Sequence, residues 1–274
     1  MAKLRGKSDF AESALAESTL VEWYSARFGS RWQTLYAALK TPPQHVEYSC
    51  DLKKTYLLDE ASVLAAQSLR LPDEGIILDA CAAPGGKSLV IASTMGEKVK
   101  LISNEFSSDR RRRLSLVLDE CLDEERRRRV AVSGFDAAAL GGNKAEWSRF
   151  DAIILDAPCS SERHVIQSEK ALAEWTPARP KFLARRQWAL LSSAFLLLKP
   201  GASLVYSTCA LCEEENDGVI KRLFEKYGSE AQIDPPDFAA GEKTVHGKII
   251  LPDADGGLGP MYVARIRKLV VCNS

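Results

Sequence analysis

The sequence predicts an α/β protein with a doubly wound, mostly parallel sheet, a helical N-terminal extension and an antiparallel C-terminal edge hairpin. From residue 75 onward, short apolar segments alternate with helical segments, which is typical of right-handed βαβ units in a parallel sheet. The end of the chain instead has two apolar segments joined by a loop rich in Gly, Asp and Pro, which indicates a hairpin. We expect residues 1–58 to form the extension and a connector, and residues 59–274 to form the α/β domain.

The N-terminal part is expected to be helical. Apolar residues over 15–28 fall on one broad helix face, and Gly29 is a plausible end for that helix. Ser30 and Gln33 have the spacing of a capping box, so a second helix is predicted to start there and to end before Pro42.

The elements of the α/β part follow in order along the chain. A connector over 43–58 leads into a helix over 59–70. Buried strands are predicted over 76–78, 99–103, 130–133, 150–155 and 204–206. Helices are predicted between them over about 86–95, 107–122, 180–198 and 213–227. The two hairpin strands are expected over 248–251 and 261–267.

Composition excludes several classes of protein. The 274 residues contain 37 Lys and Arg and 37 Asp and Glu, so the net charge is zero and bulk attraction to nucleic acid is disfavoured, although a local basic groove is compatible with it. Seven cysteines, an odd number, argue against a disulfide framework and for a reducing compartment. The sequence contains no apolar run near 18 residues and no apolar N-terminal stretch, so neither a membrane span nor a secretory signal is expected.

A glycine-rich turn, Asp79-Ala-Cys-Ala-Ala-Pro-Gly-Gly-Lys-Ser88, joins the first predicted strand to its helix. Two glycines allow the backbone to approach a ligand, and the helix N-terminus adds positive potential. A dinucleotide fingerprint is absent, and a P-loop would need glycine where Cys81 stands. The remaining interpretation is a cradle for a nucleoside and a carboxylate, as in S-adenosylmethionine. The expected cradle residues are Cys81, Ala82, Ala83, Pro84, Gly85, Gly86 and Lys87.

Acidic residues follow the next two strands. Glu105 comes twenty residues after Gly85, about the spacing at which an acid reaches ribose hydroxyls. Asp136, after the third strand, is placed to meet an adenine or its surroundings. The alternative is a structural tight turn with acids on the surface.

Two cysteines end neighbouring strands. Cys159 lies in Asp156-Ala-Pro-Cys after the fourth strand, and Cys209 lies in Ser-Thr-Cys after the fifth. Carboxyl ends of parallel strands share one edge of the sheet, so both thiols are expected to face one pocket. The alternatives are inert core cysteines, or a redox or zinc role for the Cys209-x-x-Cys212 spacing. A zinc site would need two further ligands nearby, and the sequence has no second such motif, so we expect Cys212 to be a packing residue.

These motifs resemble the NSUN, or Sun-domain, RNA 5-methylcytosine methyltransferases from about residue 50 to 268. The carriers are the glycine-rich turn, Asn104-Glu105 with Arg110, Asp156-Ala-Pro-Cys-Ser-Ser-Glu-Arg, and Tyr206-Ser-Thr-Cys. Glu105 stands where Asp is more frequent in that family. Leu52-Lys-Lys-x-Tyr-Leu-Leu and Gly259-Pro-Met-Tyr-Val-Ala-Arg look like the short mitochondrial-type members.

The resemblance implies a Rossmann-like class I S-adenosylmethionine methyltransferase domain over 59–274. Cys209 would add as a thiolate to C6 of cytosine, and Cys159 would remove the C5 proton. Asp156 would hydrogen-bond the cytosine ring, and it and Arg110 would also lie at the cofactor site. A thiol is the most nucleophilic side chain near neutral pH, which suits addition to a weakly reactive base. Exchanged roles for Cys159 and Cys209, as in DNA cytosine methyltransferases, are the main alternative.

The resemblance also bears on partners and location. It implies an rRNA or tRNA substrate whose target base leaves its stack, a protein partner that aids RNA recognition, and neither a metal nor a membrane. A mitochondrial location is expected from the resemblance, and otherwise a cytoplasmic or nuclear one. The rival functions are a non-catalytic RNA-binding or ribosome-assembly factor and a nucleotide-binding oxidoreductase.

Two regions are candidates for the RNA surface. The arginine runs 110–113 and 126–129 lie among acids, so they form either a solvated helix face or an RNA contact. The segment after Cys159 mixes cations with an aromatic residue, a usual recipe for single-stranded RNA. Its candidate residues are Glu162, Arg163, His164, Lys170, Trp175, Arg179, Lys181, Arg185 and Arg186.

Overall fold

A mixed sheet forms the centre of the computed structural model, which describes residues 2–270. Its strand order is β5-β4-β3-β6-β7-β11-β10-β9, and β8 pairs with β11 at one end. The strands from β5 to β7 are mutually parallel, whereas β11 runs antiparallel to β7, β8 and β10. The parallel strands are β3 (Gly75–Asp79), β4 (Val99–Asn104), β5 (Val130–Ser133), β6 (Phe150–Asp156) and β7 (Leu198–Thr208). The others are β8 (Ala231–Ile233), β9 (Glu242–Lys243), β10 (Lys248–Ile250) and β11 (Met261–Lys268).

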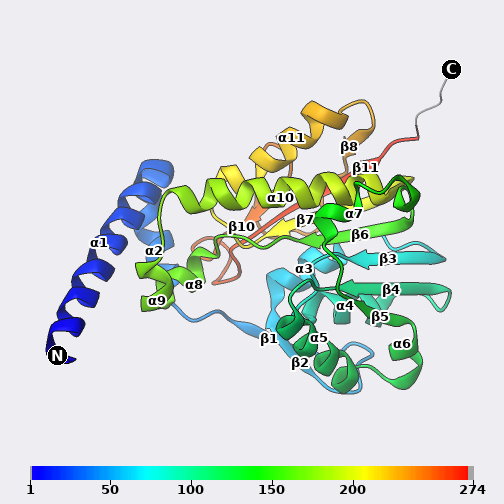
Figure 1. Ribbon diagram of the computed structural model, residues 1–274, viewed down its shortest axis with the longest axis horizontal. Helices are drawn as coiled ribbons and strands as arrows, with labels where there is room; N and C mark the ends of the chain where they lie inside the picture. The colour runs from blue at the N-terminus through cyan, green and yellow to red at the C-terminus, as the bar shows by residue number, and fades with distance from the viewer. Residues whose placement is uncertain (1, 271–274) are drawn as a thin grey trace.

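Helices cover both faces of this sheet, as the predicted doubly wound class requires (Figure 1). One apolar core joins the sheet to α3 (Glu60–Gln67), α4 (Gly86–Thr94) and α5 (Ser108–Cys121). The opposite core joins it to α7 (Ala137–Leu140), α10 (Ala178–Leu197) and α11 (Asp217–Tyr227). Because both faces are covered, each parallel strand contains buried apolar residues. Among the helices of residues 2–270, none has the length and apolar content that a membrane-spanning helix needs.

A third apolar cluster attaches the N-terminal helices to one end of the sheet. It joins α1 (Ala2–Phe28) and α2 (Trp32–Lys40) to α8 (Glu162–Gln167) and α9 (Glu169–Ala173). At its centre Tyr24, Trp32 and Trp175 are buried, and Tyr24 stacks on Trp32 with ring centroids 5.1 Å apart. In Figure 1, α1 extends from this end of the molecule.

The two N-terminal helices are confirmed, but the predicted capping box is not. A 3₁₀ turn over Gly29–Arg31 separates the helices, and α2 begins after Arg31 without a side-chain cap. The predicted connector 43–58 contains an antiparallel hairpin, β1 (His45–Tyr48) and β2 (Tyr56–Asp59). The short helix α6 (Glu124–Arg128) lies outside the predicted helices. The predicted strands and the antiparallel tail are confirmed, with β10 and β9 continuing the sheet beyond β11.

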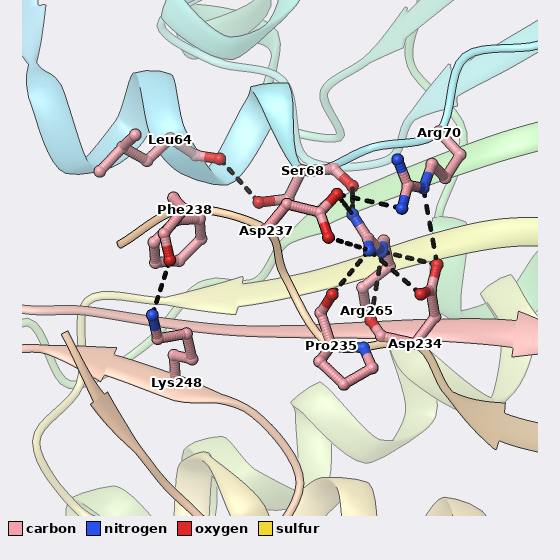
Figure 2. A network of polar contacts seen from close by, with 9 residues as sticks. All are labelled: Leu64, Ser68, Arg70, Asp234, Pro235, Asp237, Phe238, Lys248 and Arg265. Atoms are coloured by element: carbon pink, nitrogen blue, oxygen red, sulfur yellow. Dashed lines mark hydrogen bonds and ion pairs between the residues drawn. The ribbon is translucent and has the colours of Figure 1, made fainter. Parts of the chain in front are cut away.

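A buried arginine fastens the antiparallel end of the sheet. Arg265 on β11 has only 1% of its surface exposed, and Figure 2 shows its guanidinium amid a ring of acceptors. It donates to the carboxylates of Asp234 and Asp237 and to the carbonyl oxygens of Ser68 and Pro235. Because a buried guanidinium needs all its donors satisfied, this one side chain joins α3, β11 and the loop after β8.

Candidate active site

A cavity of about 680 Å³ opens at the carboxyl edge of the parallel strands. Its wall contains side chains from the ends of four strands, namely Cys81 after β3, Glu105 after β4, Asp156 at the end of β6 with Cys159 after it, and Cys209 after β7. A second cavity of about 310 Å³ shares Cys81 and Asp156 and follows the glycine-rich turn. The sheet therefore brings together most of the residues that the sequence places at strand ends.

The glycine-rich turn has the close packing that its small residues predict. Gly85 has φ +125°, and a Cβ there would lie 3.0 Å from Cγ1 of Val117. Gly86 faces Tyr56 and Leu58 of the β1–β2 hairpin, so the hairpin packs directly against the turn. The Ala83 carbonyl oxygen accepts a 2.8 Å hydrogen bond from the Arg110 guanidinium. The turn is therefore fixed by residues on both sides of it.

Lys87 does not point outward as a phosphate-binding lysine would. Its side chain is buried, and Nζ donates to Oδ2 of Asp156 at 2.8 Å and to Oγ of Ser62 at 3.1 Å. Burial acts to lower the pKa of Lys87, but the charge and hydrogen bond of Asp156 outweigh burial, so the pKa is raised. Lys87 therefore forms an ion pair with Asp156 and is not available to bind a phosphate, which agrees with the absence of a P-loop.

Asp156 is held from two sides at the rim of both cavities. Its Oδ1 accepts a 2.9 Å hydrogen bond from the Ser207 hydroxyl, while Oδ2 accepts from Lys87. Ser207 lies on β7 and Lys87 on α4. This bracing fixes the carboxylate beside the position where a ligand of the larger cavity would lie.

The two other predicted acids differ in their placement. Glu105 is buried, its Oε1 accepts from the Ser107 backbone N–H at 2.9 Å, and Arg110 lies 3.3 Å from Oε2. Within the described residues, Oε2 has no hydrogen-bond partner, so it has acceptor capacity for a ligand hydroxyl. Asp136 caps α7 and pairs with Arg186 at 2.6 Å, and it is absent from the described cavity wall.

The two cysteines form a close pair. The Sγ atoms of Cys159 and Cys209 lie 3.1 Å apart. The pKa of Cys209 is lowered, first by the hydrogen bond with Cys159 and then, against the effect of burial, by one with Ser161. The same hydrogen bond and burial raise the pKa of Cys159. The 3.1 Å separation allows either sulfur to donate, and the lowered pKa of Cys209 favours Cys209 as the thiolate and Cys159 as the donor.

Two residues that the sequence reasoning missed hold the cysteine loops. Glu215 is fully buried, and its Oε2 accepts from the Ser160 backbone N–H at 3.0 Å and from Gln187 at 2.7 Å. Asn216 accepts from the Thr208 hydroxyl at 2.6 Å and donates to the Ala210 carbonyl oxygen at 2.9 Å. Adjacent residues thus anchor the loop of Cys159 and the loop of Cys209.

The charge state of Glu215 follows from its surroundings. Burial, together with the nearby Glu162 carboxylate, raises the pKa of Glu215 to about 7. Glu162 accepts from the Tyr24 hydroxyl at 2.6 Å and from the Leu211 backbone N–H at 3.0 Å. The only sequence signal for this pair of acids was their position just after each cysteine.

Cys209 and Cys212 do not form a redox or metal-binding pair in the structure. Cys212 is buried, its thiol donates to Glu215 at 3.3 Å, and burial raises its pKa. The described residues contain no group of three or more His, Cys, Asp or Glu side chains able to hold a metal. Cys272 lies outside the described residues.

The predicted RNA segment after Cys159 requires a correction. Glu162 and Arg163 are buried, and Arg163 donates to the Gly257 carbonyl oxygen at 3.0 Å. Trp175 is 2% exposed because Trp23 and Tyr24 of α1 pack against it, so it cannot stack on a base. The arginine runs are largely ion-paired with neighbouring acids, which favours the solvated-helix interpretation. Their pairs are Arg110–Glu105, Arg112–Asp109, Arg126–Asp51, Arg126–Asp123, Arg127–Asp119 and Arg128–Glu124.

A doubly wound sheet with this turn and these strand-end acids defines a Rossmann-like α/β protein with a nucleoside-type site at its carboxyl edge. Comparison with known proteins narrows the class. The family model described as 16S rRNA methyltransferase RsmB/F matches residues 66–267, and the chain belongs to this family.

Individual relatives agree with this assignment. The chain is 40% identical over 185 residues to the ribosomal RNA small subunit methyltransferase F of Aeromonas salmonicida, covering 65% of this chain and 37% of the relative. It is similar to the crystal structure of NSun6 from Pyrococcus horikoshii with SFG, at 26% identity and TM-score 0.67, covering 79% of this chain and 54% of that one. A methyltransferase homologue from Pyrococcus horikoshii shares the fold, at 23% identity and TM-score 0.69, covering 88% of this chain and 92% of that one. The chain spans less than half the length of the curated relatives it matches.

These relatives overturn one expectation. The mitochondrial location inferred from the short motifs is wrong, because the relatives named ribosomal RNA small subunit methyltransferase F come from the bacteria Aeromonas and Vibrio. The motifs Leu52-Lys-Lys-x-Tyr-Leu-Leu and Gly259-Pro-Met-Tyr-Val-Ala-Arg therefore do not distinguish mitochondrial members.

Proposed function

We propose that this protein is an S-adenosylmethionine-dependent methyltransferase that acts on C5 of a cytosine in small-subunit rRNA through a covalent cysteine adduct. The observation that carries the proposal is the 3.1 Å separation of the Cys159 and Cys209 sulfurs in the cavity wall. A non-catalytic RNA-binding factor would need neither thiol in this position. tRNA is the alternative substrate.

The residues of the turn fit S-adenosylmethionine. Glu105 Oε2 is buried without a hydrogen-bond partner among the described residues, as suits a ribose hydroxyl donor. The turn leads into the N-terminus of α4, where backbone N–H groups and the positive end of the helix dipole suit a carboxylate. Arg110 borders the same cavity. When bound, S-adenosylmethionine supplies an electrophilic methyl group.

The two thiols would divide the work on the base. The Cys209 thiolate adds to C6 of cytosine, which moves the electron pair of the C5–C6 double bond and makes C5 nucleophilic. Once Cys209 is bonded to C6 it no longer holds the Cys159 proton, and Cys159 loses that proton to solvent. After methylation at C5, the Cys159 thiolate takes the C5 proton, the C5–C6 double bond re-forms, and Cys209 leaves as a thiolate. Asp156, braced by Lys87 and Ser207, hydrogen-bonds the ring and stabilises the protonated adduct.

The domain division supports this scheme. We propose that residues 59–274 form the methyltransferase domain and that residues 1–58 form an extension. The hairpin at the end of the extension packs under the glycine-rich turn through Tyr56 and Leu58. Tyr24 of α1 reaches Glu162, beside the cysteine loops. The extension would thus stabilise the site without contributing a reacting group.

Covalent capture tests the proposal. The full chain is incubated with S-adenosylmethionine and small-subunit rRNA that contains 5-fluorocytosine, which blocks the final proton removal. We expect a denaturant-stable protein–RNA adduct that Cys209→Ala abolishes. With unmodified RNA, we expect Cys159→Ala to leave a stalled adduct that the parent chain does not accumulate.

The buried Cys121→Ala variant, on a helix remote from the cysteine pair, serves as the matched control and should behave as the parent. Reversed phenotypes for the two variants would exchange the roles of the thiols. Failure of the parent chain to form an adduct with either rRNA or tRNA would refute the function.

A further inference from the structure

We propose that Ser161 is a further catalytic residue, whose hydroxyl donates a hydrogen bond to the sulfur of Cys209 and stabilises it as a thiolate. The inference rests on the proposed function, because it takes Cys209 as the nucleophile. Ser161 Oγ lies 3.3 Å from Cys209 Sγ and 3.5 Å from Cys159 Sγ, and it lies in the wall of the larger cavity.

The backbone of Ser161 is unusual for a serine before a helix. Ser161 precedes α8, where a serine side chain ordinarily accepts a hydrogen bond from the first turn of the helix. Here it makes no such cap, and its backbone is left-handed, with φ 56° and ψ 57°. Residues with side chains rarely adopt this conformation, and it concentrates at functional sites. It turns the hydroxyl away from the helix and toward the two sulfurs.

The hydroxyl has one proton and three acceptors within reach. These are the two cysteine sulfurs and the Cys159 carbonyl oxygen, which lies at 3.3 Å. A hydroxyl donates most strongly to the acceptor that carries negative charge. Once Cys209 ionises, it is the charged acceptor, and it then receives hydrogen bonds from Cys159 and from Ser161.

The charged groups around Cys209 make this donor important. Asp156 on β6 and Glu162 on α8 both act to raise the pKa of the Cys209 thiol, as does burial. Lys87 on α4 is the nearby cation, but its hydrogen bond goes to Asp156. The pKa of Cys209 is nevertheless lowered, chiefly by its hydrogen bond with Cys159 and further by the one with Ser161. Removing the Ser161 hydroxyl leaves Cys159 as the main group that favours the thiolate.

The test measures the ionisation of Cys209 directly. The full chain is alkylated with iodoacetamide over pH 6–10, and the rate at Cys209 is followed by mass spectrometry of its peptide. Ser161→Gly removes the hydroxyl and accepts the left-handed backbone without strain. We expect its alkylation midpoint to rise by about 0.5–1 pH unit, so that the thiolate at pH 7 falls about three- to tenfold.

The neighbouring serine provides the control. Ser160 is fully buried, and its hydroxyl has no hydrogen-bond partner among the described residues. Ser160→Ala therefore removes an equivalent hydroxyl that contacts neither sulfur, and its midpoint should equal that of the parent. Ser161→Ala keeps the backbone strain and should show the same raised midpoint as Ser161→Gly if the hydroxyl is the cause.

An unshifted Cys209 midpoint in Ser161→Gly would overturn the proposal. So would a shift confined to Cys159, because the hydroxyl would then serve the other thiol. Alkylation uses neither RNA nor S-adenosylmethionine, so this result is separate from the capture experiment, in which failure of the parent chain to form an adduct would refute the proposed function instead. If the parent chain forms the adduct, Ser161→Gly should also slow adduct formation three- to tenfold at pH 7, and less at pH 9.

Discussion

Replacing Glu215 with glutamine should remove a pH dependence of stability that this one carboxyl creates. Its pKa rises from the usual 4.5 to about 7 in the folded protein. Because the pKa of Glu215 is higher in the folded protein than in the unfolded chain, the folded protein is favoured when this carboxyl is protonated. That contribution to stability is fully present below pH 4.5 and is lost as the pH rises through 7. By linkage, ionisable Glu215 costs about 1 kcal/mol of folding free energy at pH 5 and about 3 kcal/mol at pH 8.

The local geometry makes glutamine a fair substitute. Both strong donors, the Ser160 N–H and Gln187, bind Oε2, whereas only the Cys212 thiol binds Oε1. A glutamine can present its carbonyl oxygen to the two strong donors and its amide nitrogen to the Cys212 sulfur. The Glu215→Gln chain should therefore keep the fold and gain about 2–3 kcal/mol on the parent between pH 5 and pH 8.

Urea unfolding at pH 5 and pH 8 measures this difference. Glu213→Gln is the matched control, because Glu213 is exposed two residues away, and its stability relative to the parent should not change with pH. A Glu215→Gln difference that stays within about 0.5 kcal/mol between the two pH values would refute the argument, because it would mean that burial does not hold this carboxyl near neutrality.

Two further substitutions test the structural account. Gly85→Ala should weaken S-adenosylmethionine binding at least tenfold by calorimetry and cost about 1–3 kcal/mol of stability, since φ is +125° and its Cβ would lie 3.0 Å from Val117. Gly256→Ala, where φ is also positive but the space is open, should leave binding unchanged; equal losses in both variants would refute the contact. Arg265→Met should lower the free energy of unfolding in urea by about 3 kcal/mol, because Ser68 and Pro235 lose their buried donor, and a loss below about 1 kcal/mol would contradict that role.

Local patterns predicted the elements that bury a continuous apolar surface. The five parallel strands could be predicted because each contains a short apolar run. The β1–β2 hairpin could not, because each of its strands has four residues and only one buried side chain, so neither contains a buried apolar run. Ser30 is a residue type that often caps helices, but it lies within the 3₁₀ turn over Gly29–Arg31, and α2 begins at Trp32.

The candidate site divides in the same way. Topology alone predicts that residues after parallel strands meet, which is why Cys159 and Cys209 could be paired from the sequence. The sequence predicts Trp175 to lie on an RNA-binding surface. It could not predict that Trp175 is buried, because the burial comes from Trp23 and Tyr24, about 150 residues away in the chain. The role of Glu215 could not be predicted, because it depends on hydrogen bonds with Ser160 and Gln187, which are far from it in the sequence.

The position of β11 inside the sheet has a consequence for biosynthesis. β7 carries the loop of Cys209 at its end, and its neighbours are β6 and β11. Until translation has passed residue 268 and that segment has left the ribosome, residues 203–208 of β7 lack their partner strand on one side. An unpaired strand edge is open to pairing with other chains. Newly made molecules would thus be most prone to aggregation just before the final strand inserts, and the loop of Cys209, the proposed nucleophile, would gain its finished surroundings only then.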